Sequence, residues 1–105
     1  ADVNQARNNG ATPLFIASQK GFGAAVSQLI TAGSDVNQCM AGIGWSPLFV
    51  AAWGGHTGVV ELLLRSGADR TVETTADHWG TPAGSTAEAV AEEKGHGAVL
   101  ELLRS

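Results

Sequence analysis

Three histidines and one cysteine are the side chains of this chain best suited to catalysis or metal binding. Cys39 beside a histidine could act as a nucleophile with its base, and thiol and imidazole groups are typical zinc ligands. Cys39 forms no pair with His56, His78 or His96 at the spacing of a zinc knuckle or of one helix face. We therefore predict no enzyme, no metal site and no cofactor. Hydrolytic or redox chemistry at Cys39 and His78 is the alternative, which a sulfur–imidazole distance beyond about 4 Å would exclude.

The segment Gly54–Gly58 is a second pattern that could do chemistry, because glycine-rich loops can cradle phosphate groups. It reads Gly-Gly-His-Thr-Gly and lacks the Lys-Ser/Thr ending and the preceding strand of a phosphate loop. We interpret it as a turn between two helices.

Charge and hydropathy argue against further classes of function. The formal net charge is −4, and residues 73–105 carry six acidic against two basic side chains, whereas a nucleic-acid surface needs clustered lysine and arginine. No apolar run approaches the roughly 18 residues that cross a bilayer, and no secretory leader precedes the pattern. The single cysteine cannot form an internal disulfide, which favours a reducing compartment. We expect an intracellular protein, cytoplasmic or nuclear, that binds neither nucleic acid nor membranes.

The elements that carry these residues repeat along the chain. Gly10–Leu14 (Gly-Ala-Thr-Pro-Leu) recurs as Gly44–Leu48 (Gly-Trp-Ser-Pro-Leu), and a degenerate third copy begins at Gly84. Each copy offers a hydroxyl group to cap a helix and, after a short stretch, a glycine to end it; these residues are Thr12, Ser46 and Thr86, and Gly21, Gly55 and Gly95. Helices of roughly seven to nine residues are marginal alone, so we expect helix pairs that stack to share one core.

This pattern resembles the ankyrin repeat. The Gly-x-Thr-Pro-Leu start, Gly55-His56 before a second helix and the closing Gly67-Ala68-Asp69 carry the resemblance, which covers nearly the whole chain. It implies an all-α solenoid of stacked helix pairs with β-hairpin-like finger loops, and a partner that is another protein or peptide. Phe15 and Phe49 stand where the family usually has histidine, and Phe22 replaces the histidine after Gly21. We expect Phe15 and Phe49 to pack between helices.

We expect one ankyrin repeat domain over residues 1–105. Its parts, in chain order, are a finger of a preceding repeat (1–9), repeat 1 (10–43), repeat 2 with a long inserted finger (44–83) and a capping repeat (84–105). The capping assignment follows from the acidic residues of the last copy, since a terminal repeat needs a polar outer face. We interpret the chain as a piece of a longer array or as an engineered one.

In the ankyrin family the finger tips and the outer side of the first helices form the recognition groove. Transferred by that resemblance, the groove of this chain includes Asn8, Asn9, Ala11, Gln19 and Lys20 from repeat 1, and Met40, Ile43, Trp45, Trp53 and Gly54 from repeat 2. Exposed aromatic side chains on a rigid surface are frequent hot spots of binding. We therefore expect Trp45 and Trp53 to anchor a partner. The alternative is that either tryptophan packs against a neighbouring finger and stabilises the fold.

The segment Val72–Ala83 is the most irregular part of the repeat, because the third copy is longer here than the first two. Insertions in repeat proteins tend to fall on the binding face, which makes His78 and Trp79 candidate contact residues. The segment is equally well explained as a loop that folds over the exposed end of the core with Trp79 as a hydrophobic lid.

Two functions remain open from the sequence. The first is a monomeric protein-interaction module, for which Trp45→Ala combined with Trp53→Ala should abolish partner capture and change the melting temperature little. The second is a structural spacer in a longer or engineered array with no binding surface of its own, which burial of the second and third fingers against the chain's own repeats would favour.

Overall fold

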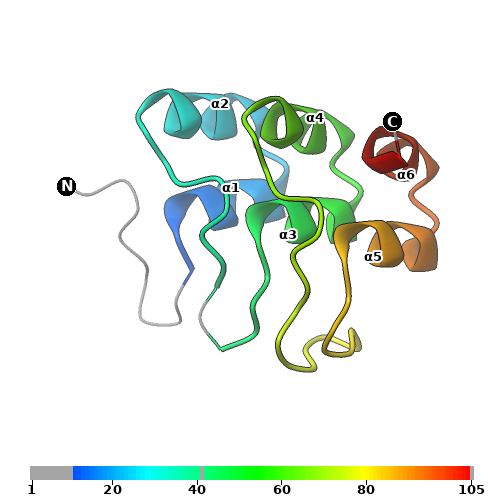
Figure 1. Cartoon of the computed structure of the whole chain (residues 1–105). Helices are drawn as coiled ribbons and strands as arrows, with labels where there is room; N and C mark the ends of the chain where they lie inside the picture. Colours follow the sequence, from blue (N-terminus) through cyan, green and yellow to red (C-terminus); the bar gives the residue numbers. More distant parts are fainter. Residues whose placement is uncertain (1–10, 41, 105) are drawn as a thin grey trace.

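Six short helices form two layers in the computed structural model, which describes residues 11–40 and 42–104. The inner layer holds α1 (Pro13–Lys20), α3 (Pro47–Gly54) and α5 (Ala87–Lys94). The outer layer holds α2 (Gly23–Thr31), α4 (Thr57–Arg65) and α6 (Gly97–Arg104). Each inner helix packs against the next one and against its own outer partner (Figure 1). The prediction of an all-α stack of helix pairs is confirmed.

The three inner helices begin and end in the same way. The hydroxyl oxygens of Thr12, Ser46 and Thr86 accept hydrogen bonds from the backbone N–H three residues later, at 3.1, 3.0 and 3.2 Å. Each of these helices ends at a glycine whose backbone is left-handed; Gly55, for example, has a φ of 71°. A residue with a Cβ adopts this conformation only with strain. The predicted helix boundaries are therefore confirmed.

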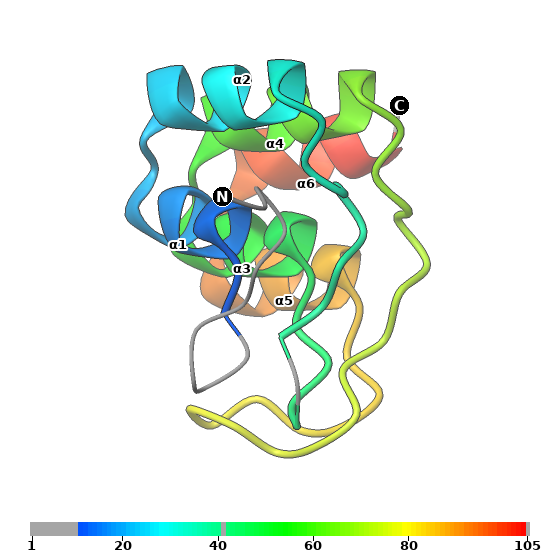
Figure 2. The ribbon, with the colours of Figure 1, turned by 90° about the vertical axis from the view of Figure 1, so that its left-hand side faces the viewer.

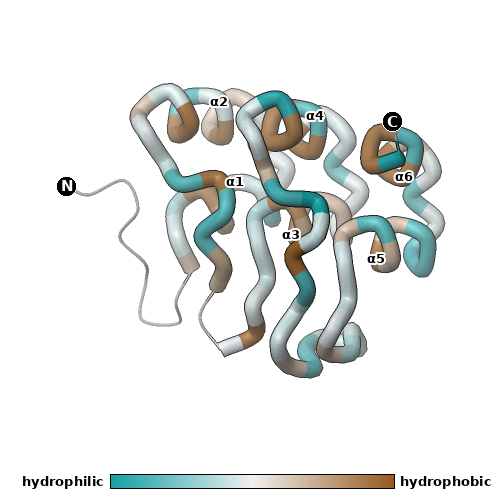
Figure 3. The backbone as a smooth tube through the Cα atoms, in the orientation of Figure 1, coloured by the Kyte–Doolittle hydropathy of each residue, from teal (hydrophilic) through white to brown (hydrophobic). Residues whose placement is uncertain are grey.

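The hydrophobic core lies between the two layers and between successive helix pairs. Figure 3 shows the apolar segments of α2 and α4 turned towards the inner layer. Phe15 and Phe49 are only 2% and 1% exposed, so their predicted packing between helices is confirmed. Burial of this apolar surface is what stabilises helices too short to persist alone.

One histidine links the second helix pair to the first, and another links the third pair to the second. The Nε2 atom of His56 lies 2.9 Å from the backbone carbonyl oxygen of Gln19, and that of His96 lies 3.1 Å from the carbonyl oxygen of Trp53. A carbonyl oxygen only accepts hydrogen bonds, so Nε2 carries the proton in both. Phe22 occupies the corresponding place in the first pair and is 57% exposed.

The second finger is the loop between α2 and α3, and the third finger is the loop between α4 and α5. Polar contacts hold these two finger loops together at their bases. Asn37 Oδ1 accepts a hydrogen bond from the backbone N–H of Asp69 at 2.7 Å, and the backbone N–H of Thr75 donates to the carbonyl oxygen of Ile43 at 2.9 Å. Among the described residues, β-type pairing is limited to one isolated antiparallel bridge, between His78 and Thr81. The fingers are thus hairpin-like loops rather than strands of a sheet.

The third finger also reaches the last helix. One guanidinium nitrogen of Arg70 donates to the carbonyl oxygens of Leu102 and Leu103, at 3.3 and 2.8 Å. These carbonyls belong to the last turn of α6, where the helix itself supplies no donor. Arg70 therefore caps α6 from the base of the finger that precedes α5.

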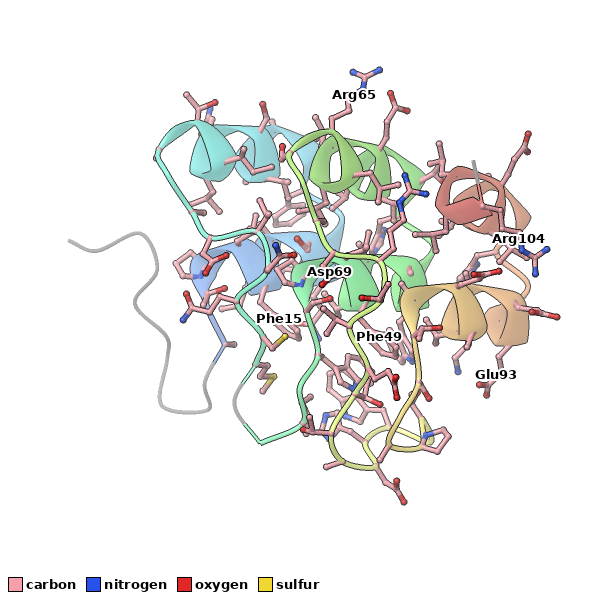
Figure 4. The ribbon with its side chains drawn as sticks, in the orientation of Figure 1. Phe15, Phe49, Arg65, Asp69, Glu93 and Arg104 are labelled. Atoms are coloured by element: carbon pink, nitrogen blue, oxygen red, sulfur yellow. The ribbon has the colours of Figure 1, made fainter. Side chains whose placement is uncertain are left out.

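The outer end of α5 and α6 is polar. Arg104 forms ion pairs with Glu88 at 2.8 Å and with Glu92 at 3.4 Å, and Figure 4 shows Arg104 at this end of the stack. Exposed ion pairs contribute little stability, but they leave a surface that water solvates well. This polarity supports our proposal that residues 84–105 act as a capping repeat.

Candidate partner-binding surface

Five aromatic rings from one inner helix and two fingers meet at one place, which we call the aromatic cluster. Its members are Trp45, Phe49, Trp53, His78 and Trp79. The indole of Trp45 lies at the centre, with ring centroids 4.7 Å from Phe49, 5.8 Å from Trp53 and 5.4 Å from Trp79. Tilted and edge-to-face rings at these separations attract one another beyond simple burial.

Trp45 is a core residue, so the expectation that it is exposed in the groove is wrong. Its side chain is completely buried, with an exposed fraction of 0%. The second finger is apolar because Trp45 fills the space between its own helix α3 and the third finger, where its ring meets His78 edge-on at 5.5 Å. The alternative role in stability is the one that its burial supports.

Trp79 stands at the tip of the third finger. The backbone groups of His78 and Thr81 exchange two hydrogen bonds of 2.9 and 2.8 Å, which leaves Trp79 and Gly80 as the two central residues of a tight turn. Both have positive φ angles, 48° and 75°, as in the type I′ turns that match the twist of a hairpin. The turn therefore fixes where the indole of Trp79 projects.

The loop containing Trp79 covers the aromatic cluster and not the outer end of the stack. The ring of Trp79 lies 5.3 Å from that of Trp53, and Trp79 remains 50% exposed. Figure 2 shows the yellow loop running beneath the inner layer of helices. The loop is thus a lid over Trp45 and, at the same time, an exposed aromatic surface.

A pocket of about 200 Å³ opens between α1, the second finger and the loop of Trp79. It is lined by Ala11, Phe15, Ile16, Gln19, Lys20, Met40 and Trp79. Five of these seven residues have apolar side chains, and the polar side chains are those of Gln19 and Lys20. Such a hollow suits a single large apolar side chain with polar contacts at its edge.

The structure brings together six of the twelve residues that the sequence proposed for the groove and the inserted finger. The pocket is lined by Ala11, Gln19, Lys20, Met40 and Trp79, and Trp53 packs against Trp79. The other candidates among the described residues, which do not line the pocket, are Ile43, Trp45, Gly54 and His78.

Trp45 and His78 support the cluster from within, since His78 is half-buried against Trp45. Ile43 is half-buried, and its carbonyl group holds the third finger. Asn8 and Asn9 lie outside the described residues.

Sequence reasoning missed three contributors to this surface. Phe15 and Ile16 line the pocket, although Phe15 is almost fully buried. The ammonium group of Lys94 lies 5.5 Å from the ring centroid of Trp53, within the range of a cation–π contact. The repeat itself signals Lys94, because it precedes Gly95 as Lys20 precedes Gly21.

The cysteine lies in a setting that disfavours its thiolate. Cys39 Sγ donates to the carbonyl oxygen of Asn37 at 3.5 Å. Burial, together with the negative charges of Asp35 and Asp69, raises the pKa of the Cys39 thiol. A raised pKa lowers the fraction of the nucleophilic form at neutral pH, so this setting gives no support to the alternative of chemistry at Cys39.

Metal clusters and membrane spans are two further kinds of site that a chain can carry. Within the described residues, no group of three or more histidine, cysteine, aspartate and glutamate side chains gathers in a way that could hold a metal ion. None of the helices in the described part is both long and apolar enough to cross a membrane.

Comparison with known families classifies the fold. A family model described as ankyrin repeats (3 copies) matches residues 1–74. The chain belongs to the ankyrin repeat family. Ankyrin repeats are generally protein–protein interaction modules, and the family is typically non-enzymatic. A search of curated proteins finds no match to the chain.

The part of this ankyrin repeat protein beyond residue 74 follows the same construction. The α5–α6 pair has an N-capping Thr86, a left-handed Gly95 with φ 75° and a histidine, His96, that bonds back to the preceding pair. The degenerate copy therefore keeps the residues that make the turns and the contacts between repeats, while Pro-Leu of the first two copies is replaced by Ala87-Glu88.

Proposed function

We propose that this ankyrin repeat protein binds a partner protein or peptide on the surface formed by the pocket and the outer edge of the aromatic cluster. One observation carries the proposal: the half-exposed indole of Trp79 borders an apolar pocket on one side and stacks on Trp53 on the other. An exposed tryptophan on a rigid support loses little conformational freedom on binding. Because this entropic cost is small, such a residue often contributes much of the binding affinity.

In this proposal the predicted residues have distinct roles. Trp79 and Met40 make the apolar contacts with the partner. Gln19 and Lys20 make the polar contacts at the rim of the pocket. Trp53 borders the surface, and its position is fixed by its contact with Trp79. Trp45 contributes by supporting Trp79 from below.

The structural-spacer alternative draws support from the burial of Trp45 and from the hydrogen bond between Thr75 and Ile43, because both show fingers packed on the chain's own repeats. The side chain of Trp79, in contrast, is half-exposed. A spacer has no need of a half-exposed tryptophan beside an apolar pocket, so we favour binding.

The test is selection of short random peptides on the wild-type protein, followed by measurement of their affinity for variants. Trp79→Ala should weaken the selected peptides about tenfold or more. Phe22→Ala is the matched control, because Phe22 is the other large apolar side chain that is exposed, at 57%, in the described part of the chain; it should change affinity less than about twofold. Failure to select any peptide, or equal weakening by both substitutions, would overturn the proposal.

A further inference from the structure

The charged side chains around the binding surface indicate which class of partner it suits. Two lysines border it: Lys20 lines the pocket, and Lys94 lies over Trp53. They end the first and the third inner helix, so they flank the surface from opposite ends of the inner layer (Figure 1). The ion pairs of the described residues involve Arg65 and Arg104 and leave both lysines unpaired.

Three acidic side chains of the same end of the molecule have partners other than these lysines. Glu88 and Glu92 are paired with Arg104. The carboxylate of Asp77, at the third finger, accepts a hydrogen bond from the backbone N–H of Ala83 at 2.9 Å. Glu93 is the exception: it projects from α5 away from the α6 layer, next to Lys94 in the sequence (Figure 4).

Two hydrogen-bond donors of the aromatic cluster also lack acceptors. The indole N–H groups of Trp45 and Trp53 are buried and have no hydrogen-bond partner among the described residues. A buried donor without an acceptor costs free energy. Both rings are covered by Trp79, at 5.4 and 5.3 Å, so these two donors lie behind the exposed surface and do not contact a partner there.

The cationic groups that border this surface are therefore Lys20 and Lys94, on either side of a pocket lined mostly by apolar residues. We propose that it takes an acidic peptide, in which one large apolar side chain enters the pocket and flanking carboxylates meet Lys20 and Lys94. This inference rests on the proposed function and narrows it to one class of partner. Carboxylates attract the ammonium groups of both lysines, whereas a basic segment would bring like charges close to them.

The experiment uses three synthetic peptides with the same leucine–tryptophan core, flanked by glutamate, glutamine or lysine. The glutamate peptide should bind the wild-type protein about tenfold or more tightly than the lysine peptide at low ionic strength, and added salt should narrow this difference. Lys94→Gln and Lys20→Gln should each lower the affinity for the glutamate peptide about three- to fivefold. Lys94→Arg should retain binding because it keeps the charge over Trp53.

Glu93→Gln is the matched control on the same helix. Removing this carboxylate should strengthen the binding of the glutamate peptide, the direction opposite to Lys94→Gln. Circular dichroism of each variant verifies that the helices persist.

The outcomes separate the two proposals. If the lysine or glutamine peptide binds as well as the glutamate peptide and Trp79→Ala abolishes that binding, the acidic partner is excluded and the binding function stands. If none of the three peptides binds and random selection on the same protein also fails, the binding function falls, and the acidic partner with it.

Discussion

The imidazole of His96 joins the last helix pair to the proposed binding surface, because its Nε2 atom lies 3.1 Å from the backbone carbonyl oxygen of Trp53. The side chain of that tryptophan faces Trp79, while its carbonyl group is held by the next repeat. The same contact recurs one pair earlier between His56 and Gln19, whose side chain lines the pocket. Each histidine thus positions a backbone segment of the surface from behind.

His96→Ala should destabilise the protein by about 1–3 kcal/mol, because it leaves the carbonyl group of Trp53 without its donor and removes a ring that fills the turn. Urea unfolding followed by circular dichroism measures the effect. His96→Gln, which keeps an amide donor, should recover part of the loss. A midpoint for His96→Ala equal to that of the wild type would show that the bond contributes nothing.

Trp45→Ala should cost about 3–5 kcal/mol of stability, because it removes a fully buried indole. Trp79→Ala should cost about 1 kcal/mol, since half of that side chain is exposed and its contribution is mainly ring contact. Thermal melts of the two single variants make the comparison. The burial of Trp45 therefore argues against the expectation that replacing Trp45 and Trp53 together changes the melting temperature little. Equal melting temperatures for Trp45→Ala and the wild type would contradict the predicted loss of stability.

Gly55→Ala should destabilise the protein by roughly 1–2 kcal/mol or more, because Gly55 has a φ of 71° and a Cβ there would lie 2.8 Å from the His96 ring. Gly58→Ala is the matched control within α4, where a Cβ meets nothing within 4 Å. It should stabilise by about 0.4–1 kcal/mol through the lower entropy of the unfolded chain. Chemical unfolding of both variants measures these changes in the free energy of unfolding. Changes of the same sign for the two variants would contradict this account.

The Cys39 thiol should react slowly with a thiol-specific reagent at neutral pH, because burial and the carboxylates of Asp35 and Asp69 raise its pKa. The rate should rise with pH through a midpoint above that of a free cysteine, since only the thiolate reacts. Asp35→Asn removes one negative charge and should move the midpoint down. A pH profile identical to that of a cysteine in an unfolded peptide would contradict the raised pKa.

The helix pairs could be predicted from the sequence because their signals are local. A capping hydroxyl, a proline at the first turn and a glycine at the exit act within one helix, so Thr12, Pro13 and Gly21 define α1 without reference to the rest of the chain. The repetition of these signals then predicted the stacking.

The binding surface was only partly predictable, because exposure depends on what a distant loop does. Trp45 and Trp79 are both tryptophans in finger segments, and the sequence does not show which of them another loop covers. Trp45 is buried because the third finger folds back over it, and Trp79 is exposed because a two-residue turn places it at the tip. Gln19, Lys20 and Met40 were found by their repeat position, which the fold preserves.

The guanidinium group of Arg70 gives the stack a mechanical property. It holds the final carbonyl groups of α6 from the same finger that carries Trp79 at its tip. Tension applied to α6, whether from an attached domain or from an optical trap, would be borne first by this clamp. Once it breaks, the finger loses one of its contacts at the base, and the proposed binding surface should weaken before the inner helices come apart.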